Sequence, residues 1–173
     1  MRAAIVMNLL AFVVMIPNVG GVQDKPARHV EKDGGFSIEL PPNWTAQEFG
    51  GLKFKILVGP VVNGFGSNMV FMDESSTSNL KDYVAASKKA LQAVIKDIKE
   101  ISETEMQTAE GAACVRLVFE AEHQGIRLRQ TVYCLDLAPG KKLAITCSTL
   151  ADGGDKLDAV FEASAKSLRI EKK

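Results

Sequence analysis

The stretch from residue 101 to residue 150 constrains the fold most, because four strand-like segments there are separated by short breaks that contain glycine. The breaks read AEG, HQG and LAPGK. Glycine supplies the positive φ angles that tight turns need. Consecutive antiparallel strands are therefore predicted over residues 101–108, 113–122, 126–135 and 143–150.

Patterns on either side of this stretch complete the expected order of elements. Alternating apolar residues predict strands over residues 36–40, 52–58 and 68–72. Apolar residues three or four apart predict a helix over residues 79–98, capped by Ser78 or Asn79, and another over residues 155–168, capped by Asp155. The order β-β-β-α-β-β-β-β-α favours an α+β fold, in which two helices pack on a mostly antiparallel β-sheet.

The first 35 residues have a different character from the rest. Arg2, the apolar residues 3–16 and then Pro17 follow the layout of a signal peptide, with cleavage expected after Gly21. A buried N-terminal helix or strand is the alternative. The charged residues 22–35 are expected to be a flexible linker, and residues 36–170 a single domain. An exported protein, periplasmic or extracellular, with no stable membrane anchor after cleavage is predicted, because 14 apolar residues are fewer than the roughly 20 that span a bilayer.

The charge balance bears on the kind of partner. Lys plus Arg and Asp plus Glu each number 21, so the net charge is zero. No overall field attracts this chain to nucleic acid or to an anionic membrane. We expect a monomer that meets an envelope protein partner.

Three cysteines would face an oxidising compartment after export, and strand register decides which can pair. A two-residue turn at Gln124 and Gly125 sets Glu120 opposite Arg129 and Glu122 opposite Arg127. Cys114 and Cys134 then point to opposite faces and cannot bond. Cys147 is expected on the same face as Cys134 but diagonal to it, so a bond between these two stays an alternative to three free thiols.

The residue types that catalysis and metal binding need are sparse. The two histidines, His29 and His123, fall in the expected linker and at a turn, and no motif places either beside a nucleophile. Glu120 and Glu122 already have arginine partners in the register above, which disfavours a metal site with His123. We therefore expect no enzyme activity, no cofactor and no metal.

The connection between the second and third strands is the candidate contact surface. Residues 59–68 contain three glycines and are too long for a tight hairpin, so they are expected to project as a loop. Val61, Val62, Phe65 and Asn68 are the candidate partner-binding residues. A fold-back of the loop as a lid on the core is the alternative. Trp44 is expected to be structural, buried over one end of the core.

Three segments resemble the PsbP-like and DcrB-like proteins: FSIELPPNW, VVNGFGSNMVF and the closing KSLRI. The resemblance covers residues 36–170 and implies an α/β/α sandwich. It also implies a small exported accessory protein that acts as a protein-binding or assembly module. A carrier of a small apolar ligand, with a pocket between helix and sheet near Cys134 and Cys147, is the alternative function.

Overall fold

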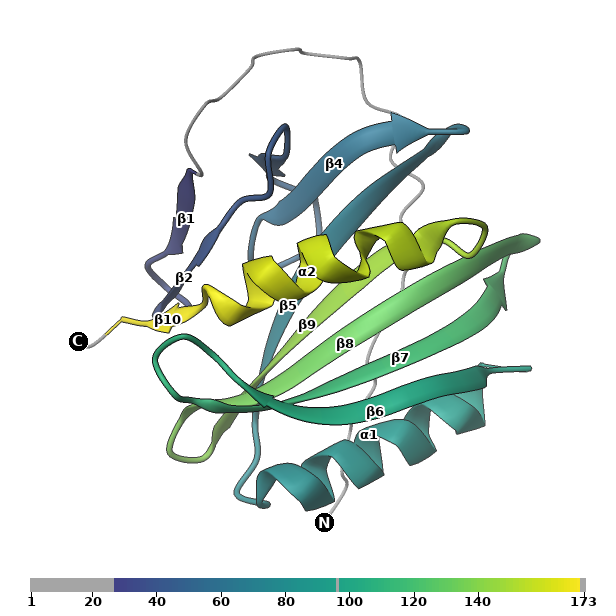
Figure 1. Ribbon diagram of the computed structural model, residues 1–173. Helices are drawn as coiled ribbons and strands as arrows, with labels where there is room; N and C mark the ends of the chain where they lie inside the picture. Colours follow the sequence, from purple (N-terminus) through teal and green to yellow (C-terminus); the bar gives the residue numbers. More distant parts are fainter. Residues whose placement is uncertain (1–26, 96, 172–173) are drawn as a thin grey trace.

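Two β-sheets and two helices form three layers in the computed structural model, which describes residues 27–95 and 97–171 (Figure 1). The predicted signal peptide lies outside the described residues. The larger sheet has seven strands in the order β3-β4-β5-β9-β8-β7-β6, and every pairing in it is antiparallel. Its strands are Thr45–Gln47, Ile56–Val62, Phe65–Ser75, Lys141–Leu150, Ile126–Ala138, Ala113–His123 and Lys99–Gln107, in that order.

A second, three-stranded sheet lies with helix α2 on one side of the large sheet. It contains β1 (Arg28–Glu31), β2 (Phe36–Glu39) and β10 (Arg169–Ile170), with β2 in the middle. The main core forms between these elements and the large sheet, and includes Phe36 and Ile38 of β2 and Phe161 of α2. The predicted α+β class is confirmed, but a single sheet is wrong because β2 leaves the large sheet at its two prolines.

Helix α1 (Leu80–Val94) packs on the other side of the large sheet, mainly against β7 and β8. The side chain of Asn79 accepts a hydrogen bond from the Asp82 backbone amide at 2.9 Å, so Asn79 is the N-cap, as predicted. The second predicted helix is split into a 3₁₀ turn (Gly154–Leu157) and α2 (Asp158–Lys166). Asp155 does not cap it; it lies within the 3₁₀ turn.

Part of the predicted flexible linker is ordered. Residues 28–31 form β1, which pairs with β2 in the register Arg28↔Glu39 to Glu31↔Phe36. Arg28 also forms an ion pair with Glu39 at 2.7 Å. The charges that suggested a linker are satisfied at a sheet edge.

The cysteine register is partly as predicted. Glu120 faces Arg129 and Glu122 faces Arg127, and Cys114 and Cys134 lie on opposite faces. Cys147 lies on the α2 side and Cys134 on the α1 side, so the expected shared face is wrong. A bulge between Asp136 and Ala138 shifts the β8–β9 register by one residue and reverses the parity. All three cysteines are free.

Candidate functional site

The predicted projecting loop is a tight hairpin. β4 continues through Gly59 and Pro60 to Val62, and β5 begins at Phe65. Asn63 and Gly64, with φ of 51° and 78°, make a two-residue turn with positive φ at both positions. A register shift between Val58 and Val61 accommodates the extra residues, which is why the connection looked too long for a hairpin.

The structure separates the four candidate residues into two pairs. Val61 and Val62 are 45% and 59% exposed and lie together at the end of the hairpin. We call residues 60–64 the valine tip. Phe65 and Asn68 are buried, at 3% and 1% exposed. The lid alternative does not hold for the two valines, whereas Phe65 does fold into a core.

The base of the hairpin is anchored to the neighbouring strands. Phe65 packs in a small cluster with Leu128 of β8, joined by Ile126 and Leu150. The Ser67 hydroxyl donates to Thr149 Oγ1 of β9 at 3.0 Å. These contacts fix the position of the valine tip relative to the large sheet.

Trp44 supports the other side of the hairpin. A Cβ built on Gly59 would lie 2.5 Å from the Trp44 ring, so the indole presses directly on the β4 backbone. β3 pairs with β4 only from Ile56 to Val58. Among the described strands, none pairs with the outer edge of β4 beyond Val58, so the tip offers a short strand edge beside its exposed valines.

A groove runs between α2 and the turn that follows β2. It encloses about 350 Å³, which is within the range of small-ligand sites. Leu40, Pro41 and Pro42 form one wall, and Ala159, Val160 and Ala163 the other. The Ser164 hydroxyl donates to the Glu39 carbonyl at 2.5 Å and holds the walls together. Small apolar residues on the outer side of the closing helix were the sequence signal for this groove.

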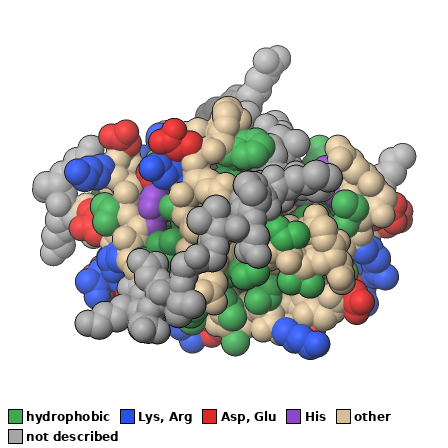
Figure 2. Space-filling view, turned by 90° about the horizontal axis from the view of Figure 1, so that it is seen from above, with side chains coloured by type: hydrophobic (Ala, Val, Ile, Leu, Met, Phe, Trp, Pro, Cys, Tyr) green, Lys and Arg blue, Asp and Glu red, His purple; other side chains and the backbone are tan. Residues whose placement is uncertain are grey.

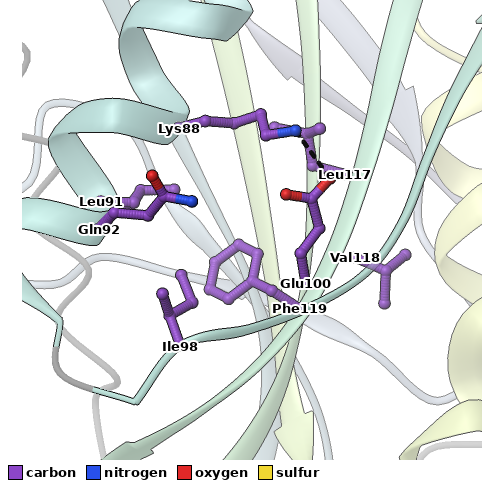
Figure 3. Close-up of a pocket in the computed structure, with 8 residues that line it drawn as sticks. All are labelled: Lys88, Leu91, Gln92, Ile98, Glu100, Leu117, Val118 and Phe119. Carbon is purple, nitrogen blue, oxygen red and sulfur yellow. Dashed lines mark hydrogen bonds and ion pairs between the residues drawn. The ribbon is translucent and has the colours of Figure 1, made fainter.

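The pocket under α1 is much smaller. It holds about 30 Å³, enough for roughly one water molecule. Figure 3 shows Lys88 reaching from α1 toward Glu100 above Leu91 and Phe119, and the Lys88–Glu100 ion pair measures 2.7 Å. The predicted ligand pocket shared by Cys134 and Cys147 is wrong, because the sheet separates the two thiols.

The cysteines are poor nucleophiles. Burial raises the pKa of Cys114 to about 12. Burial, with the nearby Cys114 and Glu74, raises the pKa of Cys134 to about 12. Burial also holds the pKa of Cys147 well above its ordinary value. The three thiols stay protonated at neutral pH, which argues against a cysteine-dependent reaction.

The acidic side chains of the large sheet bind arginines and lysines. Glu120 forms ion pairs with Arg127 at 3.1 Å and with Arg129 at 3.7 Å. Asp73, which follows the core of β5, is bound by Lys53 and Lys141. Within residues 27–95 and 97–171, no group of three His, Cys, Asp or Glu side chains is placed to hold a metal ion.

Viewed from above, hydrophobic side chains lie in the middle of the molecular surface and charged groups lie mainly around its rim (Figure 2). No helix within the described part of the chain is long and apolar enough to cross a membrane.

Solved structures with the same fold were found by structural comparison, whereas no family model and no curated protein matches the sequence. The protein of unknown function PA94 from Pseudomonas aeruginosa, described as a putative regulator, is 15% identical with a TM-score of 0.61. The match covers 86% of this chain and 99% of PA94.

Two further neighbours have described contexts. Cyanobacterial PsbP (CyanoP) from Synechocystis sp. PCC 6803 is 14% identical with a TM-score of 0.61, over 90% of this chain and 98% of that one. LpqN of Mycobacterium tuberculosis, described as involved in cell envelope biogenesis, is 11% identical with a TM-score of 0.65, over 86% and 87%. The PsbP-like α/β/α sandwich is confirmed; at these identities the likeness establishes the fold alone.

Proposed function

We propose that this protein is a non-catalytic accessory protein of the cell envelope that binds a protein partner through the valine tip. The observation that carries the proposal is the pair Val61 and Val62, 45% and 59% exposed, on a hairpin whose base is anchored by Phe65 and Ser67. Adjacent exposed apolar side chains on an ordered element are typical of contact surfaces.

The shape of this surface favours a protein over a small molecule. The tip projects, whereas small ligands are bound in concave sites. The free outer edge of β4 beyond Val58 adds backbone groups that an extended partner segment can pair with. Pro60 has no amide hydrogen, so such pairing would extend over only a few residues.

The envelope location rests on two supports. The N-terminal sequence has the layout of a signal peptide. One protein of the same fold, LpqN, is described as acting in cell envelope biogenesis. We propose export to the periplasm or cell exterior, where the domain acts as a monomer.

A pull-down from envelope extract tests the contact surface. Val61→Asp with Val62→Asp places two charges on the tip while leaving Phe65 in its cluster. The matched control is Val94→Asp, since Val94 is a 70% exposed valine on the opposite side of the large sheet from α2. We expect the tip variant to lose partners that the wild type and the control retain. An unchanged set of partners would remove the valine tip from consideration.

The groove beside α2 supports a second candidate, a carrier of a small apolar ligand. Its volume of about 350 Å³ and its largely apolar walls fit such a ligand. Native mass spectrometry of protein purified without detergent is the test, with Ala163→Phe as the variant that fills the groove. A bound mass that disappears in Ala163→Phe supports the carrier, and the absence of any bound mass in the wild type removes it.

A further inference from the structure

A row of polar side chains crosses the α1 side of the large sheet. Asn68 of β5 faces Ser148 of β9, which in turn faces Gln130 of β8. Gln130 Nε2 donates to Ser148 Oγ at 3.0 Å. We call Asn68, Ser148 and Gln130 the polar row. It is an unusual feature in the interior of a sheet face, because buried polar groups need partners.

Apolar side chains flank the polar row on both sides. Ile56, Val58 and Val70 form a cluster toward β4, and Phe65 and Leu128 form another near the turns. All five are less than 9% exposed. The polar row and its flanks together make a continuous strip across β4, β5, β9 and β8.

The described elements cover only part of this strip. The cluster that α1 forms with the sheet reaches β9 and β5 only at Ala144 and Met72, beyond the end of the polar row. Phe49 and Leu52 pack on the flank at β4. Yet Asn68, Ser148 and Gln130 are only 1%, 2% and 4% exposed. Side chains stand perpendicular to a sheet, so burial this complete requires a further covering element.

One atom of the polar row still lacks a partner. Asn68 Nδ2 donates to the Gly66 carbonyl at 3.1 Å, but no described residue donates to Asn68 Oδ1, which is buried. A buried acceptor without a donor is unfavourable. The element that covers the strip should therefore be apolar and carry one hydrogen-bond donor.

We propose that residues 3–16 of this chain pack on the strip as a helix, with Asn8 against Asn68. This segment is apolar at every position except Asn8, whose side-chain amide is a donor. Fourteen residues make a helix of about 21 Å, and four strands about 4.8 Å apart span about 14 Å. Residues 17–26 can extend over about 33 Å from Ala27, which is enough to pass around an edge of the sheet.

The segment that resembles a signal peptide thus also covers a binding surface. Its removal after Gly21 bares the polar row and its apolar flanks, and so provides the mature domain with a second docking surface. This consequence rests on the proposed export. The packing of residues 3–16 on the strip does not, and the test below uses the full chain.

Thiol labelling of Asn68→Cys measures whether the strip is covered. The tryptic peptide that contains this position has no native cysteine. We expect iodoacetamide to label Asn68→Cys at least about tenfold more slowly in the otherwise native chain than in a chain that also carries Leu9→Asp and Leu10→Asp. Thr45→Cys, on the exposed strand β3, is the control and should label at the same rate in both chains. Equal rates for Asn68→Cys in the two chains, fast or slow, would overturn the proposal.

Disulfide formation tests the proposed register in the same full chain. Asn8→Cys combined with Asn68→Cys should form an intramolecular bond on mild oxidation, because the two Cβ atoms would lie about 4 Å apart. Asn18→Cys combined with Asn68→Cys is the matched pair and should stay reduced. Equal bond formation in both pairs, or none in the first, would rule out the contact between Asn8 and Asn68.

Discussion

Asp158 joins the start of α2 to two strands of the large sheet. Its carboxylate accepts from Arg129 Nη2 at 2.7 Å and from Arg116 Nη2 at 3.0 Å. Asp158→Asn removes the charge between these two partly buried arginines. We expect the free energy of unfolding to fall by about 1–3 kcal/mol, measured by urea denaturation. Asp152→Asn, on the exposed loop before α2, is the control and should change it by less than about 0.5 kcal/mol. Equal losses would contradict the role of the ion pairs.

The same carboxylate predicts a pH dependence. Burial raises the pKa of Asp158, but the hydrogen bond and charge of Arg129 and the charge of Arg116 outweigh burial, so the pKa lies below its ordinary value. A lowered pKa in the folded state adds stability above the unfolded value, about 3.9, and this stability is lost as pH falls through the folded value. The difference in stability between wild type and Asp158→Asn should thus be constant near pH 7 and shrink below about pH 4. A difference that grows in acid would contradict this sign.

Trp44 stabilises the core. It is 6% exposed, meets Phe161 edge to face at 5.9 Å and contacts Gly59 of β4. Trp44→Ala should cost about 3–5 kcal/mol of unfolding free energy, because a large cavity forms between α2 and the hairpin. A variant that keeps its melting temperature but loses partner binding would instead indicate a direct binding role.

At the scale of the element, the β4–β5 hairpin depends on its two-residue turn. Gly64 has a φ of 78°, which residues with a Cβ rarely adopt. Gly64→Ala should lower stability by about 1 kcal/mol and weaken partner binding by shifting the valine tip. Gly50→Ala is the matched control, since a Cβ there meets nothing within 4 Å and its φ is not in the left-handed region. Equal effects of the two substitutions would argue against a role for turn geometry.

The hairpin also shows where the sequence was sufficient and where it was not. Asn63-Gly64 is a strong turn signal, but the glycines around it and Pro60 suggested a loop. The bulge that absorbs the extra residues forms only because β5 pairs with β9 on its other side. Local pattern could not predict a contact made by residues about 80 positions away.

The long strands and α1 were predictable because each has a strong local pattern. Apolar alternation and glycine turns located β7, β8 and β9, and Asn79 marked the start of α1. The short strands β1, β3 and β10 were missed, since pairing partners rather than propensity make them strands. The same holds for the candidate site: exposure of Val61 and Val62 followed from the sequence, whereas burial of Phe65 and Asn68 required the neighbouring strands.

At the scale of the whole molecule, both faces of the large sheet are covered, and this decides the state of the cysteines. Cys114, Cys134 and Cys147 are free and at most 3% exposed. We expect mass spectrometry after alkylation without reductant to show three labels in denaturant and almost none, within minutes, in the folded protein. A protein that takes up only one label in denaturant would contain a disulfide and contradict the structure.

The central claim is that the valine tip contacts an envelope protein. A photo-crosslinking amino acid placed at Val62 and activated in intact cells tests it most directly, with the same residue at the exposed Val94 as the matched position. The account predicts a crosslink to one envelope protein from position 62 and none to that protein from position 94. The same crosslinks from both positions, or none from position 62, would contradict it.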